Sequence, residues 1–185
     1  MGRVNTDRDP TPSAGGFQCA TCGRWHDTLP MDVGFAEPLY VAELSEPERA
    51  RRVTFDGDFR VLRDADATHY FVRGVVEVPV IGTPEKFCFG AWSTLSADSY
   101  EQARAAYRDN GSAGPLFGWL ANRFPGYATT LNLKVNVLVR PDLKPAIVLQ
   151  DAGHALAREQ RNGITPHRVR QVVEKVLHPD PPSKA

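Results

Sequence analysis

Two segments in the middle of the chain alternate between apolar and polar residues, as strands do when one side faces a core. Residues 70–80 read YFVRGVVEVPV and place Tyr70 and four valines on one face. Residues 87–95, FCFGAWSTL, repeat this alternation after a short, turn-like connection at Gly82-Thr83-Pro84. We therefore expect the two segments to pair as an antiparallel hairpin.

The strongest alternation lies further along the chain, at residues 130–139, TLNLKVNVLV. Leucines and valines face one way there, whereas Asn132, Lys134 and Asn136 face the other. Pro141-Asp142 then predicts a turn that leads into a second apolar segment, AIVLQ. The sequence thus predicts a second hairpin from residues 130–139 and 146–150.

Helix signals fall between and after these hairpins. Ser45 and Glu48 have the spacing of a capping box at the start of a short helix. Thr165 followed by Pro166 predicts the start of the last helix, whose valines form an apolar stripe that continues to Leu177. Helical spacing and terminating residues predict three more helices, at about 98–109, 116–124 and 151–161.

This order of elements predicts an α+β fold with a mostly antiparallel sheet built from hairpins and with helices packed on one side. Helices do not alternate with single strands, and the chain has neither a Gly-x-Gly-x-x-Gly turn nor a phosphate-binding loop, which disfavours a doubly wound nucleotide fold. We expect one α+β domain at 17–177 between disordered tails at 1–16 and 178–185, where proline, glycine and charged residues replace apolar periodicity.

Charge and cysteine content narrow the functional classes. The 185 residues include 22 basic and 22 acidic ones, so no overall field favours nucleic acid or an anionic membrane. No apolar run is long enough to span a bilayer, which predicts no membrane partner. The three cysteines form an odd set that does not resemble a secreted disulfide framework, so we expect a cytoplasmic protein.

The candidate chemistry lies near the start of the predicted domain, in Cys19-Ala20-Thr21-Cys22-Gly23. Two residues between the thiols allow both sulfurs to reach one zinc ion, and the glycine suits the tight turn of such a loop. His26 follows closely enough to provide a third ligand. The sequence therefore predicts a zinc knuckle with Cys19, Cys22 and His26 as ligands.

A tetrahedral structural site needs a fourth ligand, and the chain has no second Cys-x-x-Cys. The sequence leaves several candidates open: Cys88, His69, His154, Asp27 or a water molecule. The alternative is a pair of thiols without metal. A redox pair is disfavoured, because thioredoxin-like cysteines lie where a strand enters a helix in a βαβ unit. If zinc binds, we expect it to fix the N-terminal segment rather than to catalyse a reaction.

Other polar residues define a possible pocket made of Asp58, Arg73, Glu77 and His154. Arg73 and Glu77 share one face of the predicted strand at 70–80, where a solvent-facing surface with one ion pair is the competing interpretation. His154 and Glu159 have the residue types of an acid–base pair. No clear nucleophile is paired with a base, so the catalytic residues are left unassigned.

Several of these segments, taken in order, resemble an uncharacterised bacterial family described as domain of unknown function 2199. The likeness covers roughly 17–177, and no activity, substrate or partner is implied by it. The stretches that carry it are Cys19–Gly23 with His26, LPMD at 29–32, YFVRG at 70–74, VPV at 78–80, FGAW at 89–92, PGY at 125–127, TL at 130–131 and HAL at 154–156, followed by Gln160, Gly163 and Ile164.

Three functional hypotheses remain. The first is a small cytoplasmic binding or interaction protein with a structural zinc knuckle, whose partner is a small molecule or a protein. The second is a metal-assisted hydrolase with an open zinc position and His154, Glu159 or Asp58 as base. The third and weakest is a nucleic-acid-binding module that uses the knuckle and the arginines of 49–52, against which the balanced charge argues.

Overall fold

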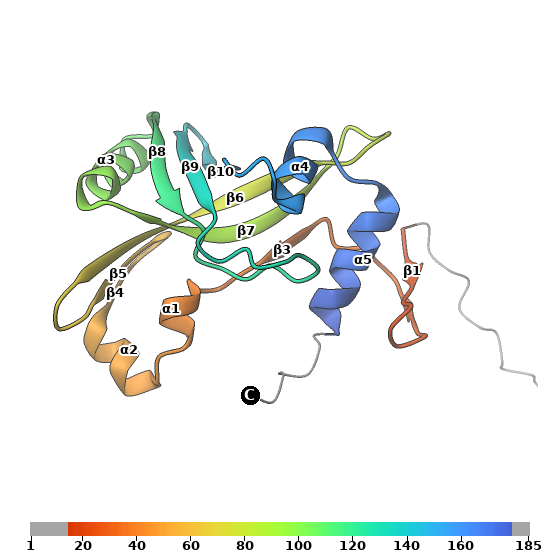
Figure 1. Ribbon diagram of the computed structural model, residues 1–185, viewed down its shortest axis with the longest axis horizontal. Helices are drawn as coiled ribbons and strands as arrows, with labels where there is room; N and C mark the ends of the chain where they lie inside the picture. The colour runs from red at the N-terminus through yellow and green to blue at the C-terminus, as the bar shows by residue number, and fades with distance from the viewer. Residues whose placement is uncertain (1–14, 179–185) are drawn as a thin grey trace, which may run out of the picture.

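A long antiparallel hairpin forms the centre of the structure, as the alternation predicts. In the computed structural model, which describes residues 15–178, β6 (Thr68–Pro79) and β7 (Lys86–Leu95) pair from Tyr70 with Leu95 to Pro79 with Lys86 (Figure 1). The buried valines of β6 lie on one face, as expected. The predicted tails at 1–16 and 178–185 fall almost wholly outside the described residues.

The other strands extend this hairpin into a mixed, mostly antiparallel sheet. Its order along the main path is β3-β7-β6-β10-β9-β8, and the parallel pairs among the described strands are β3 with β7 and β10 with β6. The second predicted hairpin is confirmed as β9 with β10. A further hairpin, β4 with β5, joins the other half of β6. The bounds are β3 (Asp32–Gly34), β4 (Val53–Asp56), β5 (Phe59–Arg63), β8 (Ala113–Trp119), β9 (Lys134–Arg140) and β10 (Leu143–Leu149).

The predicted helix at 116–124 is wrong, because most of this segment is β8 and its continuation. β8 pairs with β9, and its end then meets β7 at a bridge between Ser93 and Leu120. A Cβ on Gly118 would lie 2.1 Å from the carbonyl oxygen of Thr94, so this approach requires glycine. A short apolar run fits a helix and a strand equally well, and here the pairing partners decide.

The helices begin close to the predicted positions. The capping box of Ser45 and Glu48 is present, and the Thr165 side chain accepts a hydrogen bond from the N–H of Arg168. The helix predicted at about 98–109 is α3, whose cap is Ser96, because the Ser96 hydroxyl accepts a hydrogen bond from the N–H of Ser99. The bounds are α1 (Leu39–Ala42), α2 (Glu46–Arg52), α3 (Ala97–Arg108), α4 (Ala155–Asn162) and α5 (Pro166–Leu177).

Helices cover both faces of the sheet, so the expectation of a single covered side holds only for α3, α4 and α5. These three pack their buried residues into the larger core, together with the valines of β6. α1 packs Val41 on the opposite face, against Phe71 and Trp92. Figure 1 shows α3 and α4 above the central hairpin and α1 and α2 below it. Among the described residues, no helix combines the length and apolar character needed to cross a membrane.

Candidate metal centre

The knuckle is a small hairpin at the start of the described chain. Its strands β1 (Phe17–Gln18) and β2 (Trp25–His26) pair with Phe17 opposite His26. Gly23 has φ +69°, a left-handed conformation that favours glycine, and its N–H donates to the carbonyl oxygen of Cys19 at 2.9 Å. This turn folds Cys22 back toward Cys19, as the spacing predicts.

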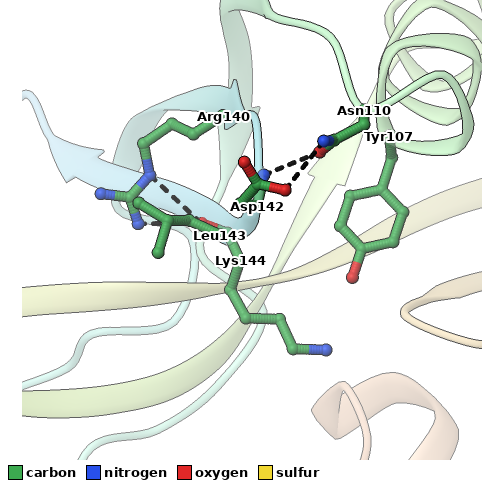
Figure 2. A pocket seen from close by; sticks show the side chains of 6 residues that line it. All are labelled: Tyr107, Asn110, Arg140, Asp142, Leu143 and Lys144. Atoms are coloured by element: carbon green, nitrogen blue, oxygen red, sulfur yellow. Dashed lines mark hydrogen bonds between the residues drawn. The ribbon is translucent and has the colours of Figure 1, made fainter.

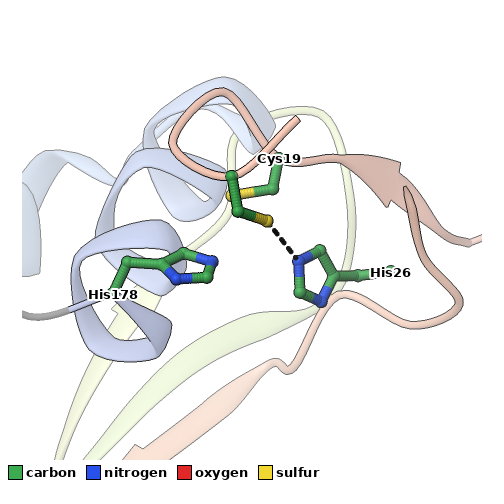
Figure 3. A group of neighbouring side chains, drawn as sticks. Cys19, His26 and His178 are labelled. Carbon is green, nitrogen blue, oxygen red and sulfur yellow. Dashed lines mark hydrogen bonds between the residues drawn. The ribbon is translucent and has the colours of Figure 1, made fainter. Parts of the chain in front are cut away.

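Four side chains converge next to this hairpin. The ligand atoms of Cys19, Cys22, His26 and His178 all lie within 4.8 Å of one another (Figure 3). The Sγ atom of Cys22 lies 3.6 Å from Nε2 of His26. Two thiols and two imidazoles are a donor set that can hold a metal ion, so the structure brings together the three predicted ligands and adds His178 as a fourth candidate.

The fourth candidate ligand, His178, was not among the predicted ligands, because it lies in the segment 178–185 that was expected to be a disordered tail. It directly follows α5, and its backbone N–H donates to the carbonyl oxygen of Glu174 at 2.9 Å. Nε2 of its ring is buried and has no hydrogen-bond partner among the described residues. An imidazole nitrogen of this kind is suited to a metal ion. The only signal in the sequence is its position immediately after the apolar stripe of the last helix.

Direct contacts also join the hairpin to α5. The N–H of Ala20, between the two cysteines, donates to the carboxylate of Glu174 at 2.8 Å. Phe17 is buried and its ring stacks on His26, with centroids 5.1 Å apart. Figure 1 shows β1 beside α5, at the end of the molecule away from α2 and α3. The cluster therefore connects two segments from opposite ends of the described chain.

The local environment favours the thiolate at Cys22. The backbone N–H of Arg24 and then the His26 side chain lower the pKa of the Cys22 thiol to about 6. The thiolate is the form of cysteine that binds metal ions. Cys19 is 1% exposed, so its sulfur faces the protein interior and the other ligand atoms.

The other candidates for the fourth ligand lie outside this group. Cys88 is on β7, where burial, followed by the charges of Glu77 and Asp32, raises the pKa of its thiol. His69 contacts Asp64, with Nε2 at 3.1 Å from a carboxylate oxygen. His154 caps α4 by accepting the N–H of Leu156 on Nδ1. The convergent cluster does not include Asp27 either.

The four residues of the predicted pocket do not form one cluster. Tyr107 and Lys144 hold the Asp58 carboxylate, and both line a hollow of about 270 Å³ (Figure 2). Burial alone would raise the pKa of Asp58, but these two hydrogen bonds, together with the positive charges of Lys144 and Arg73, hold that pKa below its usual range.

Of the remaining members of the predicted pocket, Arg73 lies next to Asp58, whereas Glu77 and His154 are engaged elsewhere. Glu77 binds Lys86 at 2.6 Å and Arg140 at 2.9 Å, as on an ordinary strand surface. Arg73 joins Asp58 through a backbone hydrogen bond of 2.7 Å. No hydrogen bond or ion pair of the described residues links His154 to the other three. Glu159 binds Tyr127 and Arg168, which removes it from any pairing with His154.

Comparison with protein families gives one match. The chain belongs to the family described as "Uncharacterized protein conserved in bacteria (DUF2199)", whose model matches residues 18–164. That range contains the three ligands of the knuckle but not His178. Comparisons with curated proteins and with solved structures found no match.

Proposed function

We propose that the protein is a small binding or interaction protein whose Cys19–Cys22–His26–His178 cluster holds a structural zinc ion. The observation that carries this proposal is the convergence of two thiols and two imidazoles from both ends of the described chain. A bound zinc ion would fasten the N-terminal hairpin to the end of α5. The sheet and its cavities then form a fixed platform for a partner.

The geometry of the cluster supports zinc. Bond lengths of roughly 2.3 Å to sulfur and 2.05 Å to nitrogen, with tetrahedral angles, separate a sulfur and a nitrogen ligand by about 3.6 Å. The Sγ of Cys22 and Nε2 of His26 are 3.6 Å apart. The ligand atoms of the cluster lie up to 4.8 Å apart. The longest of these distances would need to shorten by about 1 Å for the four atoms to surround one zinc ion tetrahedrally. Small side-chain rotations are sufficient for such a change.

The same cluster argues for a structural rather than a catalytic metal. A catalytic zinc keeps three protein ligands and one open position for water, whereas four protein ligands close the coordination sphere. The bases that a hydrolase would use are also engaged elsewhere, since Asp58 binds Lys144 and Glu159 binds Arg168. The hydrolase remains the second candidate, and it requires His178 to be dispensable for metal binding.

Nucleic-acid binding has less support. Arg52 is paired with Glu48 and Asp64, and Arg49 lies 4.0 Å from Glu46. The charge of this short helix is therefore largely compensated by its own neighbours. The cysteines are free thiols in the structure, which suits a reducing compartment, and we accordingly propose a cytoplasmic location.

The proposal is tested by elemental analysis of the purified protein and by removing the fourth ligand. We expect one zinc per chain, and His178→Ala should weaken zinc binding by at least about 100-fold, because the ion loses a direct ligand. His167→Ala is the matched control. This histidine lies on α5 and contacts Gln171 at the surface, away from the cluster, so its variant should keep full zinc affinity.

Two results would contradict the proposal. The first is a protein that neither retains zinc on purification nor binds it when zinc is added. The second is full zinc affinity in His178→Ala together with zinc-dependent ester or amide hydrolysis, which would favour the open site of a hydrolase.

A further inference from the structure

A cavity of about 320 Å³ lies on the sheet face that α1 covers, away from the metal cluster. It lies where the end of β8 meets β7. Its lining residues come from α1, α2, β5 to β8 and the loops that follow β5 and β8. We call this cavity the aromatic pocket, and its lining residues are Tyr40, Arg52, Leu62, Asp64, His69, Phe71, Thr94, Trp119 and Asn132.

The floor and walls of the aromatic pocket are apolar and mostly fixed. Leu62 and Phe71 are buried, at 4% and 1% exposure, and belong to the smaller core. The ring of Tyr40 stacks on Phe71 with centroids 6.1 Å apart. Trp119 remains 39% exposed and meets Phe117 edge to face at 5.3 Å. Exposed aromatic walls above a buried apolar floor are typical of small-molecule sites.

The charged residues of the pocket neutralise one another. Arg52 binds the Asp64 carboxylate, and Nε2 of His69 lies 3.1 Å from the other oxygen of that carboxylate. Arg52 also contacts Glu48, just outside the pocket, at 3.3 Å. A charged ligand would have to break these pairs or remain uncompensated against an apolar floor. The pocket is therefore suited to a neutral ligand.

Two hydrogen-bond donors at the pocket have no protein partner. Oδ1 of Asn132 accepts the hydroxyl of Tyr40 at 2.7 Å, which leaves its side-chain NH₂ group without an acceptor among residues 15–178. Oγ1 of Thr94 accepts the backbone N–H of Trp119 at 3.1 Å, and its hydroxyl hydrogen likewise has no acceptor in that range. These unused donors select a ligand that provides an acceptor oxygen.

We infer that the aromatic pocket binds a neutral, planar ring that carries a carbonyl oxygen. The ring packs against Tyr40 and Trp119 over the Phe71 floor, and the oxygen accepts hydrogen bonds from Asn132 and Thr94. A cavity of 320 Å³ accommodates a single or fused ring with a small substituent. This inference deepens the binding half of the proposed function and does not depend on the metal ion.

The test uses benzamide as the probe with the full-length, zinc-loaded protein, followed by ¹H–¹⁵N NMR. We expect saturable shifts confined to the aromatic pocket, including the indole N–H of Trp119, with a dissociation constant on the order of 1 mM. Trp119→Ala should weaken binding at least about 5-fold. Trp25→Ala is the matched control, because Trp25 is also 39% exposed but lies in the knuckle hairpin.

Charged analogues test the chemical class. Benzoate and benzylamine have similar rings, and both should bind at least about 5-fold more weakly than benzamide, because the charged side chains that line the pocket are paired with one another or with Glu48. Equal binding of benzoate, equal loss of affinity in both tryptophan variants, or shifts that spread over the surface without saturation would each overturn the inference. Zinc content measured on the same samples separates the two proposals, since a pocket that fails with zinc still bound leaves the metal centre standing.

Discussion

The metal centre and the aromatic pocket are assembled from the sequence in opposite ways. Three of the four candidate metal ligands come from residues 19–26, in a hairpin whose turn has Gly23 in a left-handed conformation. The lining of the pocket comes from residues spread between 40 and 132, none of which is unusual in its local context. Metal coordination requires a few donor atoms at fixed distances, and this requirement produces a recognisable spacing of cysteine and histidine in the sequence. A pocket requires only a shape, and a shape produces no such spacing.

The two regions also differ in their relation to the family. Every residue of the aromatic pocket lies within the matched range of 18–164, whereas His178 lies beyond it. The metal centre is thus completed by α5, and the pocket is completed by the closure of β8 on β7. Each region depends on one distant contact, and perturbing these contacts separately tests whether the regions are independent.

The largest effect is expected from Cys19→Ser, which removes a buried thiol of the proposed metal centre. Loss of the zinc ion should lower the free energy of unfolding by roughly 3–5 kcal/mol and Tm by about 6–20 °C. Benzamide binding below the new Tm should be unchanged if the two regions are independent. Calorimetry and elemental analysis provide the measurements, with Cys88→Ser as a half-buried cysteine outside the cluster. Unchanged zinc content in Cys19→Ser would rule out this cysteine as a ligand.

A smaller effect is expected from Gly118→Ala, which acts on the other region. The new Cβ would lie 2.1 Å from the carbonyl oxygen of Thr94, so β8 must move away from β7. We expect a loss of about 2–3 kcal/mol in unfolding free energy and weaker benzamide binding, with zinc content intact. Gly111→Ala serves as the control, since its Cβ would lie 3.7 Å from the nearest atom. Retained stability and retained benzamide affinity would show that the closure of β8 tolerates a side chain.

The smallest effect is expected from a change in pH, which should alter the metal centre but not the charge of Asp64 in the aromatic pocket, without any mutation. Because the pKa of Cys22 is lowered to about 6, its thiolate persists above that pH and gains a proton below it. Zinc affinity, measured by chelator competition, should therefore fall by about tenfold per pH unit below pH 6 from this group alone. Hydrogen bonding from Arg52 lowers the pKa of Asp64, so this carboxylate stays charged over the same range. Zinc affinity that is flat down to pH 5 would contradict the assignment of Cys22.

Alternation and capping predicted much of the fold. Local interactions account for the two hairpins, the capping box at Ser45 and the start of α5 after Thr165. Which side chains of a strand face the core, and which residue caps a helix, are both decided by residues a few positions apart. The helix expected at 116–124 failed for the opposite reason. Leu116, Phe117 and Trp119 satisfy either periodicity, and the partners β9 and β7 lie too far along the chain for a local pattern to show.

The candidate sites also differ in whether local sequence or distant partners determine them. Spacing alone predicted Cys19, Cys22 and His26 as ligands, since thiols with two residues between them in a turn that ends in glycine can reach one ion. The structure brings these three side chains together. Two carboxylates of the predicted pocket form ion pairs instead: Asp58 binds Lys144, and Glu77 binds Lys86 and Arg140, none of which the sequence pattern placed beside them. Oppositely charged side chains pair across neighbouring strands. Because the order of strands in the sheet is not a local property, the sequence pattern does not reveal these partners.

The sequence by itself determined the α+β class, the hairpins and three candidate ligands of the proposed metal centre, because each depends on residues that are neighbours along the chain. Only the tertiary structure decided the fourth candidate ligand at His178, the covering of both sheet faces and the aromatic pocket. The physical reason is that burial of apolar surface sets the order of strands and the docking of α5, and burial is a property of the whole chain.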